Sequence, residues 1–273
     1  PEELAAAIKA ARRHTACGPD LIPNAFLKLL GPVARVAQLT LFNRIWASGN
    51  WPDDWCQGII VPLFKKGNRA DPADYRPICL TSCVSKLFEH IVLQRLSARM
   101  ERSGLLTEEQ AGFRSGRSTL EQLFILHELC GQRKERKLPT FLAFLDIRRA
   151  YDRVWRTGLE LRLWECGIRG HMWDFLCSML GKQSVRRVAV NGGLSDRFSA
   201  SIGLAQGAVL SPLLFLVFIN GLRDALAAAN LGVKFGDRRI PLLMYADDIV
   251  LIAKSPEQLQ QMLDVVSDYA LRW

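Results

Sequence analysis

Two apolar, strand-like segments that are each broken by acidic residues constrain the fold more than any other feature of the sequence. FLAFLDIRRAYDRVW (141–155) contains Asp146, and PLLMYADDIVLIAKS (241–255) contains Asp247 and Asp248. Both have the composition of strands that lie side by side in a buried sheet. Carboxylates at the ends of such strands are costly unless a cation neutralises them. The sequence therefore predicts a site for divalent cations, with metal-assisted phosphoryl transfer as its chemistry.

Length and composition predict a folded chain with a polyanionic partner. The 273 residues suffice for one large domain or two closely packed subdomains, and 49% hydrophobic residues supply a substantial core. The formal net charge is +9, and basic residues recur along the whole chain. Any single basic cluster is compatible with an ordinary solvated surface, but the overall balance favours nucleic acid as the partner.

Cysteine usage and hydropathy indicate where the chain acts. The seven cysteines are scattered without paired CxxC spacing, so we expect neither a zinc site nor a disulfide framework. This fits a reducing, intracellular location, in the nucleus, the cytoplasm or both. The longest purely apolar run, Leu213–Ile219, is too short to cross a bilayer, and no leader is visible at the N-terminus, so no membrane partner is expected. Because the chain stops in helix-forming sequence, we expect it to be a piece of a longer protein.

Hydrophobic periodicity and turn residues predict alternating helices and strands. Helices are predicted over residues 2–13, 23–47, 83–102, about 118–135, 148–166 and 171–180, after Ser211-Pro212, and from Pro256 onward. Strands are predicted over 58–64, 140–146, 184–190 and 197–203, with a polar loop at 65–77 and a further hairpin that carries Asp247 and Asp248 near its tip. This order predicts an α+β fold in which helices cover one face of a sheet and leave the other face free for a ligand.

The three aspartates have a structural alternative. Asp146 ends a strand where open sheets bind ligands, but its position alone slightly favours a cap of the helix that follows. Capping does not explain the adjacent Asp247 and Asp248, whose mutual repulsion a cation would turn into coordination. Because successive strand residues face opposite sides, we rank Asp247 as the nearer ligand and Asp248 as a supporting one. Asp146, the carbonyl of Ile147 and the hairpin carboxylates would hold two magnesium ions, and substrate phosphates would complete each coordination shell.

The D-x-x-x-A-Y-D pattern at 146–152 and the YADD tetrapeptide at 245–248 occur together with five further segments, in one order, over nearly the whole chain. The seven segments are GPDLIPNAFLK (18–28), WCQGIIVPLFKKG (55–67), DYRPICLTSCVSKLFEHIV (74–92), LLTEEQAGFRSGRSTLEQL (105–123), FLDIRRAYDRVW (144–155), GLAQGAVLSPLLF (203–215) and YADDIVLI (245–252). Together they resemble the reverse transcriptases of non-LTR (LINE-type) retrotransposons.

The resemblance implies a right-hand polymerase made of fingers and palm, the palm being an antiparallel, ferredoxin-like sheet backed by helices, with the thumb absent. Residues 1–140 would form mostly helical fingers with some palm helix near 83–103. Residues 141–273 would form the palm, part of 160–205 returning to the fingers. The implied activity is an RNA-directed DNA polymerase in which Asp146, Asp247 and Asp248 are catalytic.

The resemblance also implies cofactors and partners. Two Mg²⁺ ions, with Mn²⁺ as an alternative, would support transfer of dNTPs onto a primer 3′-hydroxyl. The partners would be an RNA template, a DNA primer or target, dNTPs, and the thumb and endonuclease of a larger polyprotein. The resemblance ends before the primer-contacting segment and the thumb of such enzymes, so we expect weak template grip from this piece alone.

Three further residues acquire nucleotide-binding roles from the resemblance. Tyr151 would lie under the incoming sugar and clash with a 2′-hydroxyl, which selects deoxynucleotides; without the spacing from Asp146 it would be interpreted as a core tyrosine. Gln206 and Gly207 would approach the nucleotide, because glycine permits close backbone contact. The same pair also suits a turn from a hairpin into a helix.

Basic residues acquire phosphate and template roles in the same way. Arg76 and one of Lys65 or Lys66 resemble fingers residues that hold the triphosphate, since the planar guanidinium suits phosphate oxygens. The alternative for the lysines is a solvated loop. Arg114 would support the template path or the packing of the fingers.

Three other functions compete with this interpretation. An RNA-dependent RNA polymerase could use a similar palm, but a bulky ring at Tyr151 argues against ribonucleotides. A decayed or domesticated domain would bind nucleic acid without turnover, although the retained carboxylates argue against decay. A two-metal nuclease usually recruits additional acidic or histidine ligands, and the four histidines of this chain are isolated.

Overall fold

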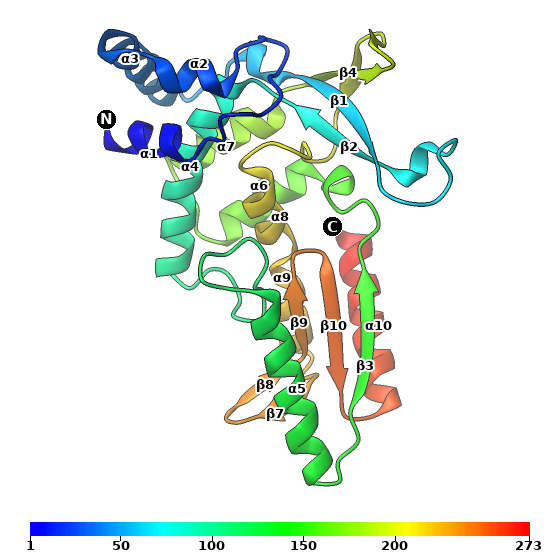
Figure 1. The fold of residues 1–273 in the computed structure, drawn as a ribbon. Helices are drawn as coiled ribbons and strands as arrows, with labels where there is room; N and C mark the ends of the chain where they lie inside the picture. Colours follow the sequence, from blue (N-terminus) through cyan, green and yellow to red (C-terminus); the bar gives the residue numbers. More distant parts are fainter. The chain divides into compact units, whose positions relative to one another are not determined.

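The structure, a computed structural model, describes all residues from 1 to 273 and divides them into two compact units. The first unit comprises Pro1–Arg99 and Tyr151–Ser211, and the second comprises Met100–Ala150 and Pro212–Trp273. Helices and strands occur in both (Figure 1), so the mixed α+β class is confirmed. The chain passes between the units more than once. The predicted division into fingers (1–140) and palm (141–273) stays a prediction.

The first unit contains a mixed sheet in the order β2-β1-β4-β5, with β6 also paired to β4. Strand β1 is antiparallel to β2 and parallel to β4. The strand bounds are β1 Gln57–Phe64, β2 Tyr75–Leu80, β4 Ser184–Val190, β5 Gly193–Leu194 and β6 Phe198–Ala200. The helices are α1 Glu2–Ala10, α2 Asn24–Leu29, α3 Pro32–Ser48, α4 Cys83–Arg102, which continues into the second unit, α6 Arg156–Glu165 and α7 His171–Gly181, with 3-10 turns η1 Asp53–Cys56, η2 Pro72–Asp74 and η3 Tyr151–Arg153.

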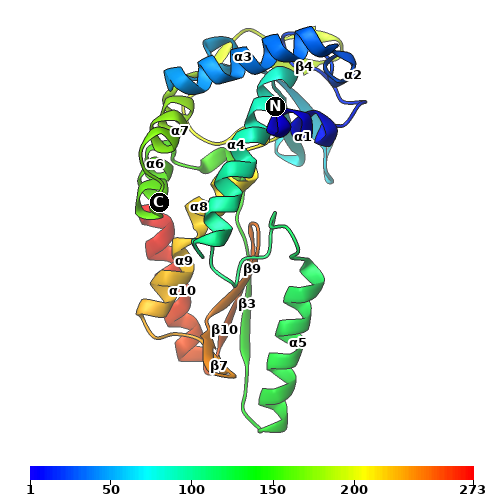
Figure 2. The ribbon, with the colours of Figure 1, turned by 90° about the vertical axis from the view of Figure 1, so that its left-hand side faces the viewer.

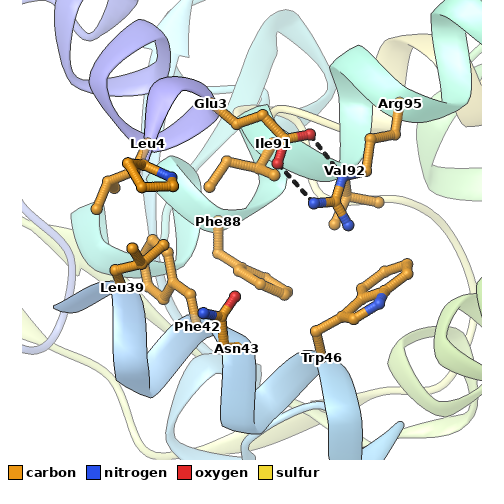
Figure 3. A pocket seen from close by; sticks show the side chains of 11 residues that line it. Glu3, Leu4, Leu39, Phe42, Asn43, Trp46, Phe88, Ile91, Val92 and Arg95 are labelled. Atoms are coloured by element: carbon orange, nitrogen blue, oxygen red, sulfur yellow. Dashed lines mark hydrogen bonds and ion pairs between the residues drawn. The ribbon is translucent and has the colours of Figure 1, made fainter. Parts of the chain in front are cut away.

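An aromatic cluster forms the core of the first unit. The ring of Phe88 on α4 lies 5.1 Å from that of Phe42 on α3 and 5.5 Å from that of Phe175 on α7. Edge-to-face pairs of this kind contribute about 0.5–1.5 kcal/mol each beyond the burial of their area. Figure 3 shows Phe42 and Phe88 beside a cavity of about 30 Å³, rimmed by the ion pair of Glu3 with Arg95. That volume is too small for a ligand larger than a few water molecules.

The second unit is built on an antiparallel sheet in the order β3-β10-β9. Figures 1 and 2 show α5 on one side of this sheet and α10 with α9 on the other. A hairpin of β7 and β8 lies beyond α9 in the sequence. The bounds are α5 Thr119–Glu135, β3 Phe141–Asp146, α8 Ser211–Ile219, α9 Gly221–Ala228, β7 Val233–Phe235, β8 Arg238–Ile240, β9 Leu242–Tyr245, β10 Asp248–Ala253 and α10 Pro256–Arg272.

Helices cover both faces of this sheet, so the prediction of one free face is wrong here. Leu129 of α5 packs with Leu243 of β9 and Val250 of β10 in one buried cluster. On the β3 side the cover is incomplete, because Phe144 keeps 74% of its surface exposed. The sheet therefore keeps an open, largely apolar strip next to the end of β3.

Local corrections have identifiable causes. The helix predicted over 23–47 is two helices, since Pro32 begins α3 and the residue before a proline avoids the helical region. The loop predicted over 65–77 ends earlier, because β2 begins at Tyr75. The helix predicted from 148 begins only at Arg156, after a turn in which Arg149 has φ 56°.

One stretch of the second half resembles a membrane span by length and composition alone. Ser211–Ala228 has 18 residues of mean hydropathy 1.4, and 61% of it is buried inside the protein. The residues form two consecutive helices, α8 and α9, and contribute buried side chains such as Leu214, Leu216 and Leu222. Burial in the protein core accounts for this apolar composition.

A buried carboxylate fixes the approach to α8 in the first unit. Glu89 of α4 is fully buried and accepts hydrogen bonds from the backbone amides of Val209, at 2.6 Å, and Leu210, at 3.1 Å. Burial raises the pKa of Glu89 above its usual value of 4.5, an effect larger than the lowering by these two hydrogen bonds.

We expect Glu89 to make stability depend on pH. Because its pKa is higher in the folded than in the unfolded chain, the folded state binds the proton more tightly, and the free energy of unfolding falls as pH rises through and above the unfolded value. Glu89→Gln should remove this fall while keeping an acceptor. Glu89→Leu should lower the free energy of unfolding by about 2–4 kcal/mol, since two buried amides lose their acceptor. Urea unfolding at about pH 5 and about pH 8 measures both effects; an unchanged pH slope in Glu89→Gln would contradict the assignment.

Candidate active site

The register of the second-unit sheet brings two of the predicted carboxylates together. Asp248, the first residue of β10, pairs directly with Asp146, the last residue of β3. Residues directly opposite in an antiparallel pair point to the same face, with Cβ atoms about 4.5–5.5 Å apart. Figure 1 shows the end of β3 and the turn between β9 and β10 at the same end of the sheet. The two carboxylates are thus close enough to share one cation.

Asp247 lies in the turn beside this pair. Tyr245 of β9 pairs with Asp248 of β10, so Ala246 and Asp247 are the two residues of a tight hairpin turn. Ala246 has φ 57°. A positive φ at the first turn position is typical of type II′ turns, where glycine is usual, so an alanine there stores backbone strain. Asp247 is half-buried, whereas Asp146 and Asp248 are exposed.

The carboxylates of Asp146 and Asp248 face each other without protein cations. Neither side chain forms a hydrogen bond or an ion pair with another protein group. Like charges directly opposite in a sheet are destabilising, and a divalent ion would remove that cost with hard oxygen ligands. The structure contains no group of three or more His, Cys, Asp or Glu side chains that could hold a metal ion. The facing pair of Asp146 and Asp248 offers hard oxygen ligands for a cation, and other oxygens would have to complete its coordination shell.

The strand register favours Asp248 over Asp247 as the hairpin carboxylate that lies nearer to Asp146. The sequence analysis places Asp247 nearer to Asp146 than Asp248, on the ground that neighbouring strand residues face opposite sides. The structure pairs Asp146 with Asp248, because Asp247 belongs to the turn and not to the strand. The register thus favours Asp248 as the partner of Asp146, with Asp247 next to Asp248 in the turn; ligation by any of them stays a prediction.

An open cavity of about 430 Å³ lies beside the carboxylates, between α5 and the sheet. Asp146 and Asp248 contribute to its wall, and so do the exposed Phe144 and the buried Gln122. Most of the remaining wall is apolar. This cavity gives a bound molecule access to both carboxylates from one side of the sheet.

Three of the predicted nucleotide-binding residues lie together in the first unit. The backbone amide of Leu204 donates a hydrogen bond to the carbonyl of Tyr151 at 2.7 Å. The side-chain amide of Gln206 lies 3.5 Å from a carboxylate oxygen of Asp152. Tyr151 and the 206–207 segment are therefore neighbours, which sequence separation did not reveal.

Gly207 meets a backbone requirement for glycine. Its φ is 121°, and a Cβ atom there would lie 2.6 Å from the carbonyl oxygen of Cys79 on β2. The amide of Cys79 also donates to the carbonyl of Gln206 at 2.6 Å. The structural interpretation of this segment, a close turn against a strand, accounts for the glycine; contact with a nucleotide stays a prediction.

The predicted phosphate-binding cations lie on the β1–β2 hairpin of the first unit. Arg76 is exposed on β2, opposite Leu63 of β1, and Lys65 and Lys66 are exposed in the connecting loop. The loop is ordered by Asp74, whose carbonyl accepts a hydrogen bond from the Lys65 amide at 2.9 Å. None of the three cationic side chains forms an ion pair in the structure, so all three are available to an anion.

Arg114 differs from these cations because its side chain is only 4% exposed. It forms two hydrogen bonds with the carboxylate of Glu101, at 2.8 and 2.7 Å, and donates to the carbonyls of Thr107 and Gln110. Its guanidinium is thus occupied by protein groups of the second unit. These contacts support a packing role and do not support the predicted template contact, which stays a prediction.

Gln110 contacts the turn that carries Asp247, and no sequence pattern predicts a role for it. Gln110 is 1% exposed, and its side chain makes hydrogen bonds with the backbone of Ala246. The only signal was its place in LLTEEQAGFRSGRSTLEQL, and nothing local in that segment points to a turn 136 residues away.

Comparison with known proteins gives a consistent result. Residues 64–273 match the family model described as reverse transcriptase (RNA-dependent DNA polymerase). Over its full length the chain is 33% identical to the probable RNA-directed DNA polymerase from transposon X-element of Drosophila melanogaster, covering 29% of that protein. It is 27% identical, also over its full length, to the RNA-directed DNA polymerase from mobile element jockey of Drosophila funebris, covering 30% of it.

A more distant match is also a protein of a retrotransposable element. Over 81% of the chain, 26% of residues are identical to a retrovirus-related Pol polyprotein from a type-1 retrotransposable element R2 of Popillia japonica, 31% of which is covered. The chain thus spans about 30% of the length of these curated relatives.

Proposed function

This chain belongs to the reverse transcriptase family, and from that premise we propose that it forms the catalytic part of an RNA-directed DNA polymerase of a non-LTR retrotransposon. Family membership confirms the resemblance predicted from the seven segments. An RNA-dependent RNA polymerase or a binding domain without turnover is not favoured, because the relatives are named as RNA-directed DNA polymerases.

The pairing of Asp146 with Asp248 is the observation that carries the proposal. Asp146, Asp248 and the neighbouring Asp247, together with the carbonyl of Ile147, would hold two Mg²⁺ ions, or Mn²⁺ in their place. When bound, such ions stabilise the charge on the attacking and leaving oxygens of an in-line displacement. The chain's own part is to fix these carboxylates at one end of a sheet, beside an open cavity.

The reaction is the attack of a primer 3′-hydroxyl on the α-phosphorus of a dNTP. A bond forms between the 3′-oxygen and the α-phosphorus, the hydroxyl proton is released to solvent, the bond from that phosphorus to the oxygen bridging to the β-phosphate breaks, and pyrophosphate leaves. Positioning and charge stabilisation account for most of the catalysis in such transfers. No side chain is assigned as general base.

The first unit would supply the nucleotide contacts. Tyr151 would exclude a 2′-hydroxyl, and the Gln206–Gly207 segment, adjacent to it in the same unit, would approach the nucleotide. Arg76 with Lys65 or Lys66, none of which has an internal ion pair, would hold the triphosphate. In right-hand terms the β1–β2 hairpin would belong to the fingers and the β3-β10-β9 sheet to the palm.

The partners follow from the activity. An RNA template, a DNA primer or target and dNTPs are the substrates, and the basic net charge of +9 supports polyanion binding. Because the relatives are longer proteins, a thumb and an endonuclease elsewhere in a polyprotein would complete the enzyme. The proposed location is the nucleus, the cytoplasm or both.

Primer extension on an RNA template by the full-length protein tests this function. We expect dNTP-dependent extension with Mg²⁺ or Mn²⁺ and its complete loss when EDTA removes the metal, since the carboxylates have no protein cation to replace it. Shortening of the primer would indicate a nuclease. Salt-sensitive binding without extension would indicate a binding domain.

A further inference from the structure

The turn between β9 and β10 is held by a segment from outside the hairpin. The amide of Met244 on β9 donates to the carbonyl of Glu109 at 2.8 Å, and the amide of Ala111 donates to the carbonyl of Met244 at 3.0 Å. Residues 109–111 therefore extend the sheet along the edge of β9, just before the turn begins. The hairpin thus has a fixed neighbour on the side away from β3.

The side chain of Gln110 completes this attachment. Its Oε1 accepts hydrogen bonds from the amides of Ala246, at 2.8 Å, and Gly112, at 2.9 Å, and its Nε2 donates to the carbonyl of Ala246 at 3.2 Å. One buried amide therefore binds both backbone groups of the residue that precedes Asp247. These bonds act on the residue with the strained φ of 57°, and they stabilise that conformation.

The supporting segment is itself rigid. A Cβ atom on Gly112 would lie 2.3 Å from the backbone nitrogen of Ala246. The backbone at Gly112 and the backbone of the turn are therefore in direct contact, and only glycine fits at position 112. In the same segment, Arg114 donates hydrogen bonds to the carbonyls of Thr107, at 2.7 Å, and Gln110, at 2.9 Å. Its guanidinium also donates to the carboxylate of Glu101. The turn is thus braced by the Gln110 amide and by direct backbone contact.

We propose that Gln110 is a positioning residue, which fixes the Ala246–Asp247 turn and so determines where the carboxylates of Asp247 and Asp248 lie relative to Asp146. The inference rests on the proposed polymerase function and adds a residue to it. A turn without this brace could relax from its strained conformation, and a displacement of about 1 Å at a reacting centre costs on the order of a hundredfold in rate. Gln110 touches neither carboxylate, so it acts through the backbone of Ala246.

Gln110→Met, which keeps the length of the side chain but removes all three hydrogen bonds, tests the proposal in the full-length protein. We expect kcat for primer extension to fall by about 10–100-fold while KM for dNTP stays within about twofold, because the turn moves and the nucleotide contacts do not. The affinity for Mn²⁺ alone, titrated by electron paramagnetic resonance, should fall by about tenfold or more.

Gln258→Met is the matched control. Gln258 is also buried in the second unit, and its Oε1 accepts a hydrogen bond from the amide of Lys254 at 3.0 Å, beyond the opposite end of β10. Loss of this buried amide should lower thermal stability, by less than Gln110→Met because one hydrogen bond is lost in place of three, and leave kcat and Mn²⁺ affinity within about twofold of the wild type.

Gly112→Ala provides an independent variant that keeps Gln110. The added methyl group would displace the backbone of Ala246, so Mn²⁺ affinity and kcat should fall as in Gln110→Met. Gly131→Ala, in α5 with no atom within 4 Å of the added carbon, is its control and should leave both quantities unchanged.

Separate outcomes distinguish this inference from the proposed function. If the wild-type protein extends no primer, the polymerase proposal fails, whereas Mn²⁺ affinity still reports on Gln110. Lowered melting temperature in Gln110→Met with wild-type kcat and Mn²⁺ affinity would overturn the inference and leave a structural role only. If Gln110→Met does not fold, a wild-type kcat and a wild-type Mn²⁺ affinity in Gly112→Ala would overturn the inference as well.

Discussion

Asp248→Asn is expected to slow primer extension by about a thousandfold or more, the loss of about 4 kcal/mol of transition-state stabilisation. Asparagine keeps the shape of the side chain but removes the negative charge that faces Asp146 across the sheet. The fold should be retained, and the melting temperature should stay equal or rise, because two like charges no longer face each other. Single-turnover incorporation at saturating dNTP, measured over a range of Mg²⁺ concentrations, gives the rate and the metal dependence together.

Asp237→Asn is the control for this substitution. Asp237 is an exposed aspartate of the same unit, in the turn between β7 and β8. The same change of charge there should leave the rate within about twofold, as is usual for surface substitutions. Extension by Asp248→Asn at the wild-type rate would show that this carboxylate has no part in catalysis.

Tyr151→Ala is expected to reduce the discrimination between dNTP and NTP by about a hundredfold, through faster use of NTP. The aromatic ring would no longer meet a 2′-hydroxyl. The contact of Tyr151 with Leu204 should survive, because it uses the main-chain carbonyl of Tyr151 and not the ring. The ratio of kcat/KM for dCTP to that for CTP is the measurement, since this ratio compares the two transition states directly.

Tyr151→Phe is the matched control, because it removes the hydroxyl and keeps the ring. Its sugar discrimination should equal that of the wild type. If Tyr151→Ala also keeps the wild-type ratio, Tyr151 is a packing residue and the sugar is selected elsewhere.

Features with strong local signals could be predicted from the sequence. The helix expected over 83–102 matches α4, Cys83–Arg102, and the apolar run before Asp146 forms β3 as expected. Strand β2 was missed because Pro77 lies within it and a proline argues against a central strand. Its place at the edge of the order β2-β1-β4-β5 explains why the proline is tolerated.

Features that depend on distant parts of the chain could not be predicted. Which hairpin carboxylate faces Asp146 depends on a turn of two residues, and a shift of one residue would exchange Asp248 for its neighbour. The brace on that turn comes from Gln110, 136 residues away from Ala246. Similarly, the burial of Arg114 depends on Glu101 and two loop carbonyls, and sequence alone does not distinguish such an arginine from a solvent-exposed one.

The coverage of the β3-β10-β9 sheet by helices also could not be predicted from the sequence. The periodicity of residues 118–135 predicts a helix, and α5 forms there, but periodicity does not say which sheet a helix covers. Leu129 and Val250 become neighbours only through tertiary packing. The presence of a helix at this position thus follows from local sequence, whereas the sheet face that the helix covers depends on tertiary packing.

We propose that Asp146 and Asp248, with Asp247 in the adjoining turn, hold divalent cations for phosphoryl transfer. The most direct test of this proposal is an anomalous-difference map from crystals of the full-length protein grown with Mn²⁺, a primer–template and a dNTP. We expect a peak within about 2.5 Å of carboxylate oxygens of both Asp146 and a hairpin aspartate. A map in which Mn²⁺ binds elsewhere, with no peak between these carboxylates, would contradict it.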